Sequence, residues 1–89
     1  MVKKRTVIRN KTGLHARPAS EFIKEAEKYT SKITIKRLDE EDAVNAKSIV
    51  MLLSLGLGKD TEVEISAKGD DEQQAVDNLV ALIDSGFGE

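Results

Sequence analysis

The chain has 89 residues, a length that fits one small domain with a single core and excludes a separate catalytic domain. It has no cysteine, which excludes disulfides and thiolate metal sites, and its one histidine cannot form a metal cluster. Residues 1–37 contain 11 Lys or Arg and 3 Asp or Glu, a net charge of +8, whereas residues 38–89 contain 3 and 13, a net charge of −10. This division predicts a charged recognition surface.

The composition also limits the classes of partner. No segment has the length and hydropathy of a signal peptide or a membrane span, so we expect a cytoplasmic protein without direct membrane insertion. A nucleic-acid-binding domain would account for the basic first half. However, the only aromatic residues are Phe22, Tyr29 and Phe87, too few for a base-stacking platform. We therefore predict an acidic protein surface as the partner, and no nucleic acid.

The spacing of apolar residues predicts seven elements in the order strand, helix, strand, strand, helix, strand, helix. The predicted strands are residues 2–9, 32–37, 43–44 and 61–67, with an acidic turn at 38–42. The predicted helices run from Pro18 to about Tyr29, from Asn45 to Leu55, and from Asp70 or Asp71 to about Ser85. Gln73 or Gln74 would complete a capping box at the start of the last helix.

These elements define a fold class. Strands with one apolar face need helices on that face only, which predicts an α+β two-layer open-faced sandwich. No repeat or linker interrupts the chain, so residues 1–89 are expected to form a single domain. We assign the charged side chains on the outer faces of the first helix, among them Glu21 and Lys24, to solvent and to no function.

The stretch from Gly13 to Ser20 contains the only histidine and the only proline of the chain. Proline is tolerated in the first turn of a helix, so Pro18 predicts a helix start here. His15 and Arg17 then lie at that start, among backbone N–H groups without intrahelical partners, a setting that favours bound negative charge. Gly13 allows a sharp turn and a close approach to a ligand.

This arrangement suits phosphoryl transfer. A neutral imidazole nitrogen is a nucleophile near pH 7, and a helix N-terminus disfavours the charged imidazolium. The Arg17 guanidinium presents a fork of donors that matches phosphate oxygens. The alternative is that His15 is a surface or capping histidine without chemistry, and spacing alone does not decide between the two.

The segment Gly-Leu-His-Ala-Arg-Pro-Ala at residues 13–19 resembles the active-site signature of HPr, the histidine-containing phosphocarrier family of the bacterial phosphoenolpyruvate-dependent sugar phosphotransferase system. The resemblance continues through residues 45–49 and 55–56 to the helix after Gly69, and so covers essentially the whole chain. It implies a four-stranded antiparallel sheet of order 1-4-2-3 covered on one face by three helices.

The resemblance also implies a function: a phosphoryl carrier that is not itself an enzyme and needs no cofactor. His15 would accept a phosphoryl group at its δ1 nitrogen from phospho-Enzyme I and pass it to IIA domains of sugar transporters, while Arg17 holds the phosphate. The matching docking residues are Ile49, Val50 and Leu53. We expect Met51, Leu52 and Leu55 to lie in the core instead, because one face of their helix must cover the sheet.

Ser48 has two interpretations. By its position it is an N-cap or first-turn serine, which local hydrogen bonding explains. By resemblance it matches the serine that an ATP-dependent kinase phosphorylates in HPr proteins of many Gram-positive bacteria, which adds a serine kinase or phosphorylase and a transcriptional regulator as partners. A phosphate there would place about two negative charges on the docking surface and oppose an acidic partner.

Two related functions compete with sugar phosphotransfer. One is a regulatory binding module that acts through Ser48; a known relative of this type lacks the histidine. The other is the nitrogen-related phosphotransferase paralogue, whose members have longer acidic hairpins and an ending similar to Ser-Gly-Phe at residues 85–87. The pairs Lys47-Ser48 and Leu55-Gly56 favour the sugar system.

Overall fold

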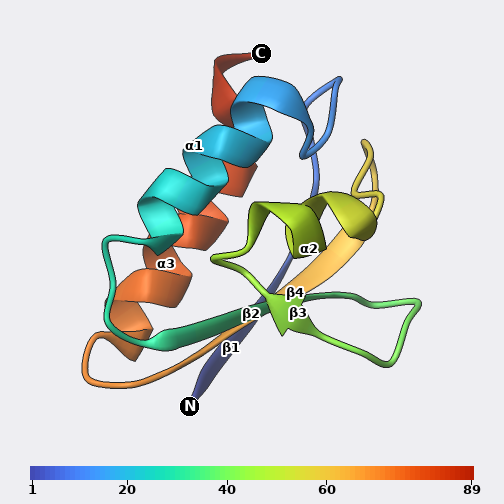
Figure 1. Cartoon of the computed structure of the whole chain (residues 1–89). Helices are drawn as coiled ribbons and strands as arrows, with labels where there is room; N and C mark the ends of the chain where they lie inside the picture. Colours follow the sequence, from blue (N-terminus) through green and yellow to red (C-terminus); the bar gives the residue numbers. More distant parts are fainter.

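The computed structural model describes all of residues 1–89. Its four strands form one antiparallel sheet in the order β1-β4-β2-β3, with bounds Val2–Val7 (β1), Lys32–Arg37 (β2), Val44–Asn45 (β3) and Glu62–Lys68 (β4). The three helices lie on one side of this sheet, with bounds Ala16–Ala26 (α1), Ile49–Ser54 (α2) and Glu72–Asp84 (α3) (Figure 1). A short 3-10 helix, η1 (Gly86–Gly88), follows α3. The predicted open-faced sandwich and its strand order are confirmed.

Side-chain alternation decides which face of the sheet the helices cover. Along β4, Val63, Ile65 and Ala67 are buried while the residues between them are not. The register places Val63 opposite Thr6 of β1 and Ile65 opposite Ile35 of β2, and all four side chains are buried. Cross-strand pairs of this kind are the unit of sheet stabilisation, and here they form the floor of the core.

The helices complete the core above that floor. α1 and α3 lie side by side in Figure 1, and each turns its predicted apolar stripe inward. Phe22 of α1 and Leu79 of α3 are fully buried, whereas Val80 and Leu82 are only partly buried. Burial of each such large apolar side chain stabilises the fold by about 1.5–3 kcal/mol. None of the helices has the length and hydropathy to cross a lipid bilayer.

Two helix ends differ from prediction by three residues or more. α1 ends at Ala26 rather than Tyr29, although Tyr29 is still buried. α2 begins at Ile49 rather than Asn45, because Asn45 pairs with β2 and its side-chain oxygen accepts a hydrogen bond from the backbone N–H of Lys47. These contacts leave α2 with only six residues.

The capping prediction for α3 is half right. Asp71 is the N-cap residue by position, but its side chain makes no cap hydrogen bond. Its carboxylate instead accepts hydrogen bonds from the backbone N–H groups of Thr30 and Ser31, 41 and 40 residues earlier in the sequence. The predicted capping box with a glutamine is wrong: Asp71 makes no cap hydrogen bond, and the Gln73 amide donates to Asp77. The carboxylate that reaches back to a backbone N–H is that of Glu72, which accepts from Gly69. Tertiary contacts have replaced the local cap.

Candidate functional site

His15 is the N-cap residue of α1, as the proline-based argument predicts. Its backbone is extended, with φ −130° and ψ 160°, and its side chain is exposed. The ring makes no capping hydrogen bond and takes part in no ion pair, so its acceptor nitrogen is open to an incoming group. An exposed, unpartnered imidazole beside free backbone N–H groups is suited to receive an anionic group.

The first turn of α1 is strained where it leaves His15. Ala16 has a φ of +50°, in the left-handed region that alanine rarely adopts, at a cost of about 1–2 kcal/mol. Pro18 is the third residue of the helix and is buried. Arg17 is helical as well, even though the residue before a proline usually avoids that conformation. A helix does begin in this stretch, as predicted, but it starts at Ala16, two residues before Pro18.

Gly13 makes the sharp turn that the sequence predicts. Its φ is +71°, and a Cβ at this position would lie 2.3 Å from the carbonyl oxygen of Leu57 and 2.8 Å from the Cα of Gly58. The next residue, Leu14, donates its backbone N–H to the same Leu57 oxygen at 2.8 Å. Gly13 therefore packs closely against the backbone of residues 57–58, and this contact anchors the loop that precedes His15.

The Arg17 guanidinium is held by two parts of the chain. Nη1 donates to Oε1 of Glu21 at 2.5 Å, and Nη2 donates to the carbonyl oxygen of Phe87 at 2.9 Å. Oε2 of Glu89 lies 3.9 Å from Nη2. Sequence reasoning missed all three contacts; the four-residue spacing from Arg17 was a local signal for Glu21, whereas nothing local pointed to the last residues of the chain.

Glu89 ties the chain end to the loop before His15, and Figure 1 places the C-terminus beside the first turn of α1. Its carboxylate accepts hydrogen bonds from the backbone N–H of Thr12 at 3.2 Å, from the Thr12 hydroxyl at 2.8 and 2.9 Å, and from the Asn10 amide at 3.3 Å. These hydrogen bonds lower the pKa of Glu89 below its ordinary value, and the bond from the Thr12 hydroxyl contributes most. The Asn10 amide also donates to the Gly13 oxygen at 2.8 Å, so Glu89 and Asn10 hold this loop together.

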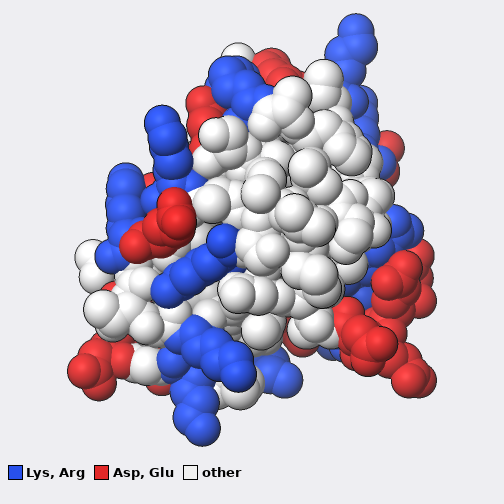
Figure 2. All heavy atoms as spheres, in the orientation of Figure 1, with Lys and Arg blue, Asp and Glu red and all other residues white.

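α2 presents an exposed apolar surface next to α1. The predicted docking residues Ile49, Val50 and Leu53 are exposed, Val50 to 73%. Leu52 is fully buried, as expected, but Met51 is 43% exposed, so the prediction that it lies in the core is wrong. A six-residue helix turns fewer side chains toward the sheet than its apolar content suggested. Figure 2 shows an uncharged area over this part of the molecule, with acidic residues gathered at the hairpin side.

A groove connects this apolar surface to the first turn of α1. It has a volume of about 510 Å³ and is lined by residues of both helices, including Ala16, Ile23, Ile49 and Leu53. Ala16 directly follows His15 in the chain, so the groove reaches the backbone next to His15. Exposed apolar surface of this kind marks protein–protein contact sites.

A family model described as the PTS HPr component phosphorylation site matches residues 2–85. The chain belongs to the HPr family. Proteins of the HPr family are phosphocarriers and not enzymes, as the resemblance implied.

Relatives and solved structures agree with this assignment. Phosphocarrier protein HPr of Haemophilus influenzae is 49% identical over 71 residues, 80% of this chain and 81% of the relative. The HPr-like protein Crh of Halalkalibacterium halodurans is 43% identical over 84 residues, 94% of this chain and 98% of the relative. A crystal structure of HPr from Thermoanaerobacter tengcongensis, 47% identical, superposes with a TM-score of 0.94 over 100% of this chain and 98% of that one. The chain spans 17% of the multiphosphoryl transfer protein of Haemophilus influenzae, to which it is 40% identical.

In this HPr-family chain, Ser48 is the N-cap of α2. Its hydroxyl oxygen accepts a hydrogen bond from the backbone N–H of Met51 at 3.3 Å, so the capping interpretation of Ser48 is confirmed. The residue is half-buried. The neighbouring Lys47 reaches away from the helix and donates its ammonium group to the carbonyl oxygen of Tyr29 at 2.6 Å. Both residues therefore help to fix the start of α2.

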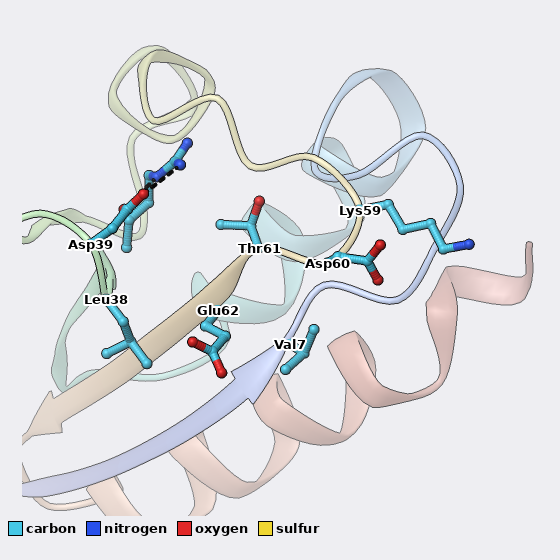
Figure 3. Close-up of a pocket in the computed structure, with 8 residues that line it drawn as sticks. Val7, Leu38, Asp39, Lys59, Asp60, Thr61 and Glu62 are labelled. Carbon is cyan, nitrogen blue, oxygen red and sulfur yellow. Dashed lines mark hydrogen bonds and ion pairs between the residues drawn. The ribbon is translucent and has the colours of Figure 1, made fainter.

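A second hollow contains none of the predicted site residues (Figure 3). It has a volume of about 450 Å³ and lies where the end of β1 meets the start of β4 and the base of the acidic hairpin. Its cations and carboxylates partly neutralise each other, as in the ion pair between Arg37 and Asp39 at 2.9 Å. The guanidinium of Arg37 lowers the pKa of Asp39. No group of three or more His, Cys, Asp or Glu side chains is arranged to hold a metal ion.

Proposed function

We propose that this protein accepts a phosphoryl group on His15 from phospho-Enzyme I and passes it to IIA domains of sugar transporters. The observation that carries the proposal is the exposed, unpartnered His15 ring at the N-cap of α1. Arg17 lies two residues later on the same helix turn, with a donor fork suited to phosphate. This role places the protein in the cytoplasm with those partners.

The transfer step balances without an added acid or base. The lone pair of the neutral His15 δ1 nitrogen attacks phosphorus and forms the N–P bond. The bond from phosphorus to the donor breaks, and the donor atom keeps its electron pair. The proton on the other ring nitrogen stays in place. Donation to the IIA domain is the same exchange in reverse, so the protein's part is to present the ring and to stabilise the phosphoryl oxygens.

Both partners are proposed to dock on the same surface. Ile49, Val50 and Leu53 supply exposed apolar area, and Met51 extends it. The groove between α1 and α2 leads from that area to Ala16. A partner that covers these residues excludes water from the imidazole, which strengthens the hydrogen bonds to the transferred group.

Phosphorylation with purified components tests this function. Incubation with phosphoenolpyruvate and Enzyme I is expected to add one acid-labile phosphate per chain. His15→Ala should abolish the label while leaving the circular dichroism spectrum and unfolding midpoint nearly unchanged, because the side chain is exposed. Full labelling of a folded His15→Ala protein would refute the assignment.

Regulation through Ser48 is the second candidate function. The similarity to Crh over nearly the whole chain supports it, as does the position of Ser48 beside the docking residues. A phosphate on Ser48 would add about two negative charges next to the apolar surface and select different partners, a transcriptional regulator among them. Incubation with ATP and an HPr serine kinase, with Ser48→Ala as control, tests it; absence of acid-stable phosphate would remove this candidate.

The choice between sugar and nitrogen branches needs its own comparison. The pairs Lys47-Ser48 and Leu55-Gly56 favour the sugar system, whereas the acidic hairpin and the Ser-Gly-Phe ending favour the nitrogen system. Rates of phosphate exchange with Enzyme I of each branch distinguish them. Faster exchange with the nitrogen form would reverse our assignment.

A further inference from the structure

The Arg17 guanidinium already has anionic or carbonyl partners on both of its terminal nitrogens. Nη1 donates to the Glu21 carboxylate and Nη2 donates to the Phe87 carbonyl. Neither contact involves His15. Three of the five N–H groups of Arg17 remain free, but the two contacts set the direction of the guanidinium. A fork that turns toward a phosphoryl group on His15 therefore gives up at least one of them.

The two carboxylates near Arg17 differ in how firmly they are held. Glu89 accepts hydrogen bonds from Thr12 and Asn10 and lies 3.9 Å from the guanidinium, so it is fixed to the loop. Glu21 has Arg17 as its one side-chain partner, and its side chain is 38% exposed. A partly exposed pair four residues apart on a helix is weakly held, so Glu21 is the partner that exchanges.

We propose that Glu21 is a positioning residue that competes with the phosphoryl group for Arg17 and so weakens the retention of phosphate on His15. This inference rests on the proposed function. When the N–P bond forms, Nη1 transfers its hydrogen bond from the Glu21 oxygen to a phosphoryl oxygen, and the Glu21 carboxylate turns into solvent. When the phosphoryl group leaves, Glu21 takes its place. The ion pair lost in the phosphorylated state favours onward transfer to the acceptor.

The Glu21→Gln variant tests the competition. Glutamine keeps the length and helix propensity of glutamate but removes its charge. The equilibrium constant for phosphoryl transfer from phospho-Enzyme I to this protein should rise about two- to fivefold, the range expected for a partly exposed ion pair. The ratio of phosphorylated to free protein is measured by ³¹P NMR with both proteins at known concentration. The difference from the wild type should shrink as salt is added.

A matched control removes one charge far from the site. Glu41 is exposed on the acidic hairpin and has no ion pair, so Glu41→Gln changes the net charge equally without touching Arg17. Its equilibrium constant should equal that of the wild type. An equal rise in both variants would show that net charge alone is responsible, and the proposal would be wrong.

A double-mutant cycle tests whether Glu21 acts through Arg17. In an Arg17→Gln background, Glu21→Gln should no longer change the equilibrium constant. A persistent rise there means that Glu21 repels the phosphoryl group directly, which contradicts the proposal. No effect of Glu21→Gln in the wild-type background, with labelling still lost in His15→Ala, refutes this inference and leaves the carrier function intact. Labelling of His15→Ala refutes both.

Discussion

The two ends of α1 use their polar groups in opposite ways. Beyond its C-terminal end, the Tyr29 hydroxyl donates to Glu25 at 2.6 Å and accepts from the Asn78 amide at 2.7 Å. The Asp71 carboxylate accepts from the backbone N–H groups of Thr30 and Ser31 at 2.8 and 3.0 Å. Burial raises the pKa of Tyr29, while the Tyr29 hydroxyl lowers the pKa of Glu25. Every one of these contacts joins α1 or its following loop to α3 or closes α1 on itself.

At the N-terminal end the side chains of His15 and Arg17 are exposed. The His15 ring is unpartnered, and Arg17 is held by the Glu21 carboxylate and the Phe87 carbonyl. Ala16 adds backbone strain at the same place. Buried and tertiary hydrogen bonds thus fix the C-terminal end of α1 to the fold, whereas the N-terminal end combines exposed polar side chains with backbone strain, a combination that clusters at functional sites.

The largest expected effect comes from a substitution at Gly13, in the loop that precedes the N-terminal end of α1. Gly13→Ala places a Cβ 2.3 Å from the Leu57 oxygen at a φ of +71°, so we expect a loss of about 3 kcal/mol in the free energy of unfolding. Gly86→Ala is the matched control: its φ is also +71°, but nothing lies within 4 Å of the added Cβ, so it should cost about 1 kcal/mol. Urea titration measures both. Equal losses would show that backbone conformation, and not the contact with residues 57–58, sets the cost.

The next effect, at Arg17, distinguishes a loss of phosphoryl transfer from a loss of stability at the N-terminal end of α1. Arg17→Lys keeps the positive charge but loses the planar fork, so we expect the rate of phosphoryl transfer to fall about 10- to 100-fold. The KM for Enzyme I should change little, because the docking residues on α2 are untouched. The unfolding midpoint should also change little, since Arg17 is exposed. Steady-state kinetics of labelling measure the two parameters, and a rise in KM without a fall in kcat would assign Arg17 to docking instead.

The sequence predicted the sheet better than it predicted the surroundings of the site. The strand at residues 32–37 has the predicted bounds, because strict alternation of Ile33 and Ile35 with polar residues has only one period to match. Met51 was misplaced since α2 is apolar on several sides, and periodicity cannot choose which of those sides faces the sheet. That choice depends on how α2 packs, which is a tertiary property.

The contacts around Arg17 divide in the same way. His15 was placed correctly at the helix start, and Pro18 in the first turn, because proline restricts the backbone locally; the first helical residue is nevertheless Ala16. Glu21 was assigned to solvent, although its spacing from Arg17 allowed the pair that forms. Glu89 had no local signal, since the residue that it contacts, Thr12, is 77 positions earlier. Contacts between distant segments are set by the completed fold.

The smallest expected effect concerns Asp71, which contacts the loop after the C-terminal end of α1. Hydrogen bonds from Ser31 and Thr30 lower the pKa of Asp71 from its ordinary value of 3.8 to about 2. Because the folded-state pKa lies below the unfolded one, the ionised carboxylate stabilises the fold above about pH 4, and this contribution is lost as the pH falls toward 2.

Asp71→Asn should therefore unfold more easily than the wild type at pH 7, with the difference in unfolding free energy narrowing between about pH 5 and pH 2. Asparagine has only one side-chain oxygen, so its amide N–H₂ would face one of the backbone N–H groups of Thr30 and Ser31 and leave it unpaired. Urea titrations at several pH values measure the difference.

Asp70→Asn is the control, because Asp70 is exposed and has no hydrogen bond to the loop. If the difference between Asp71→Asn and the wild type does not depend on pH, the packing of the Asp71 side chain, and not its charge, holds α3 to the loop after α1. Phosphoryl transfer by Asp71→Asn at pH 7 should match the wild type, since the contact lies at the end of α1 opposite to His15.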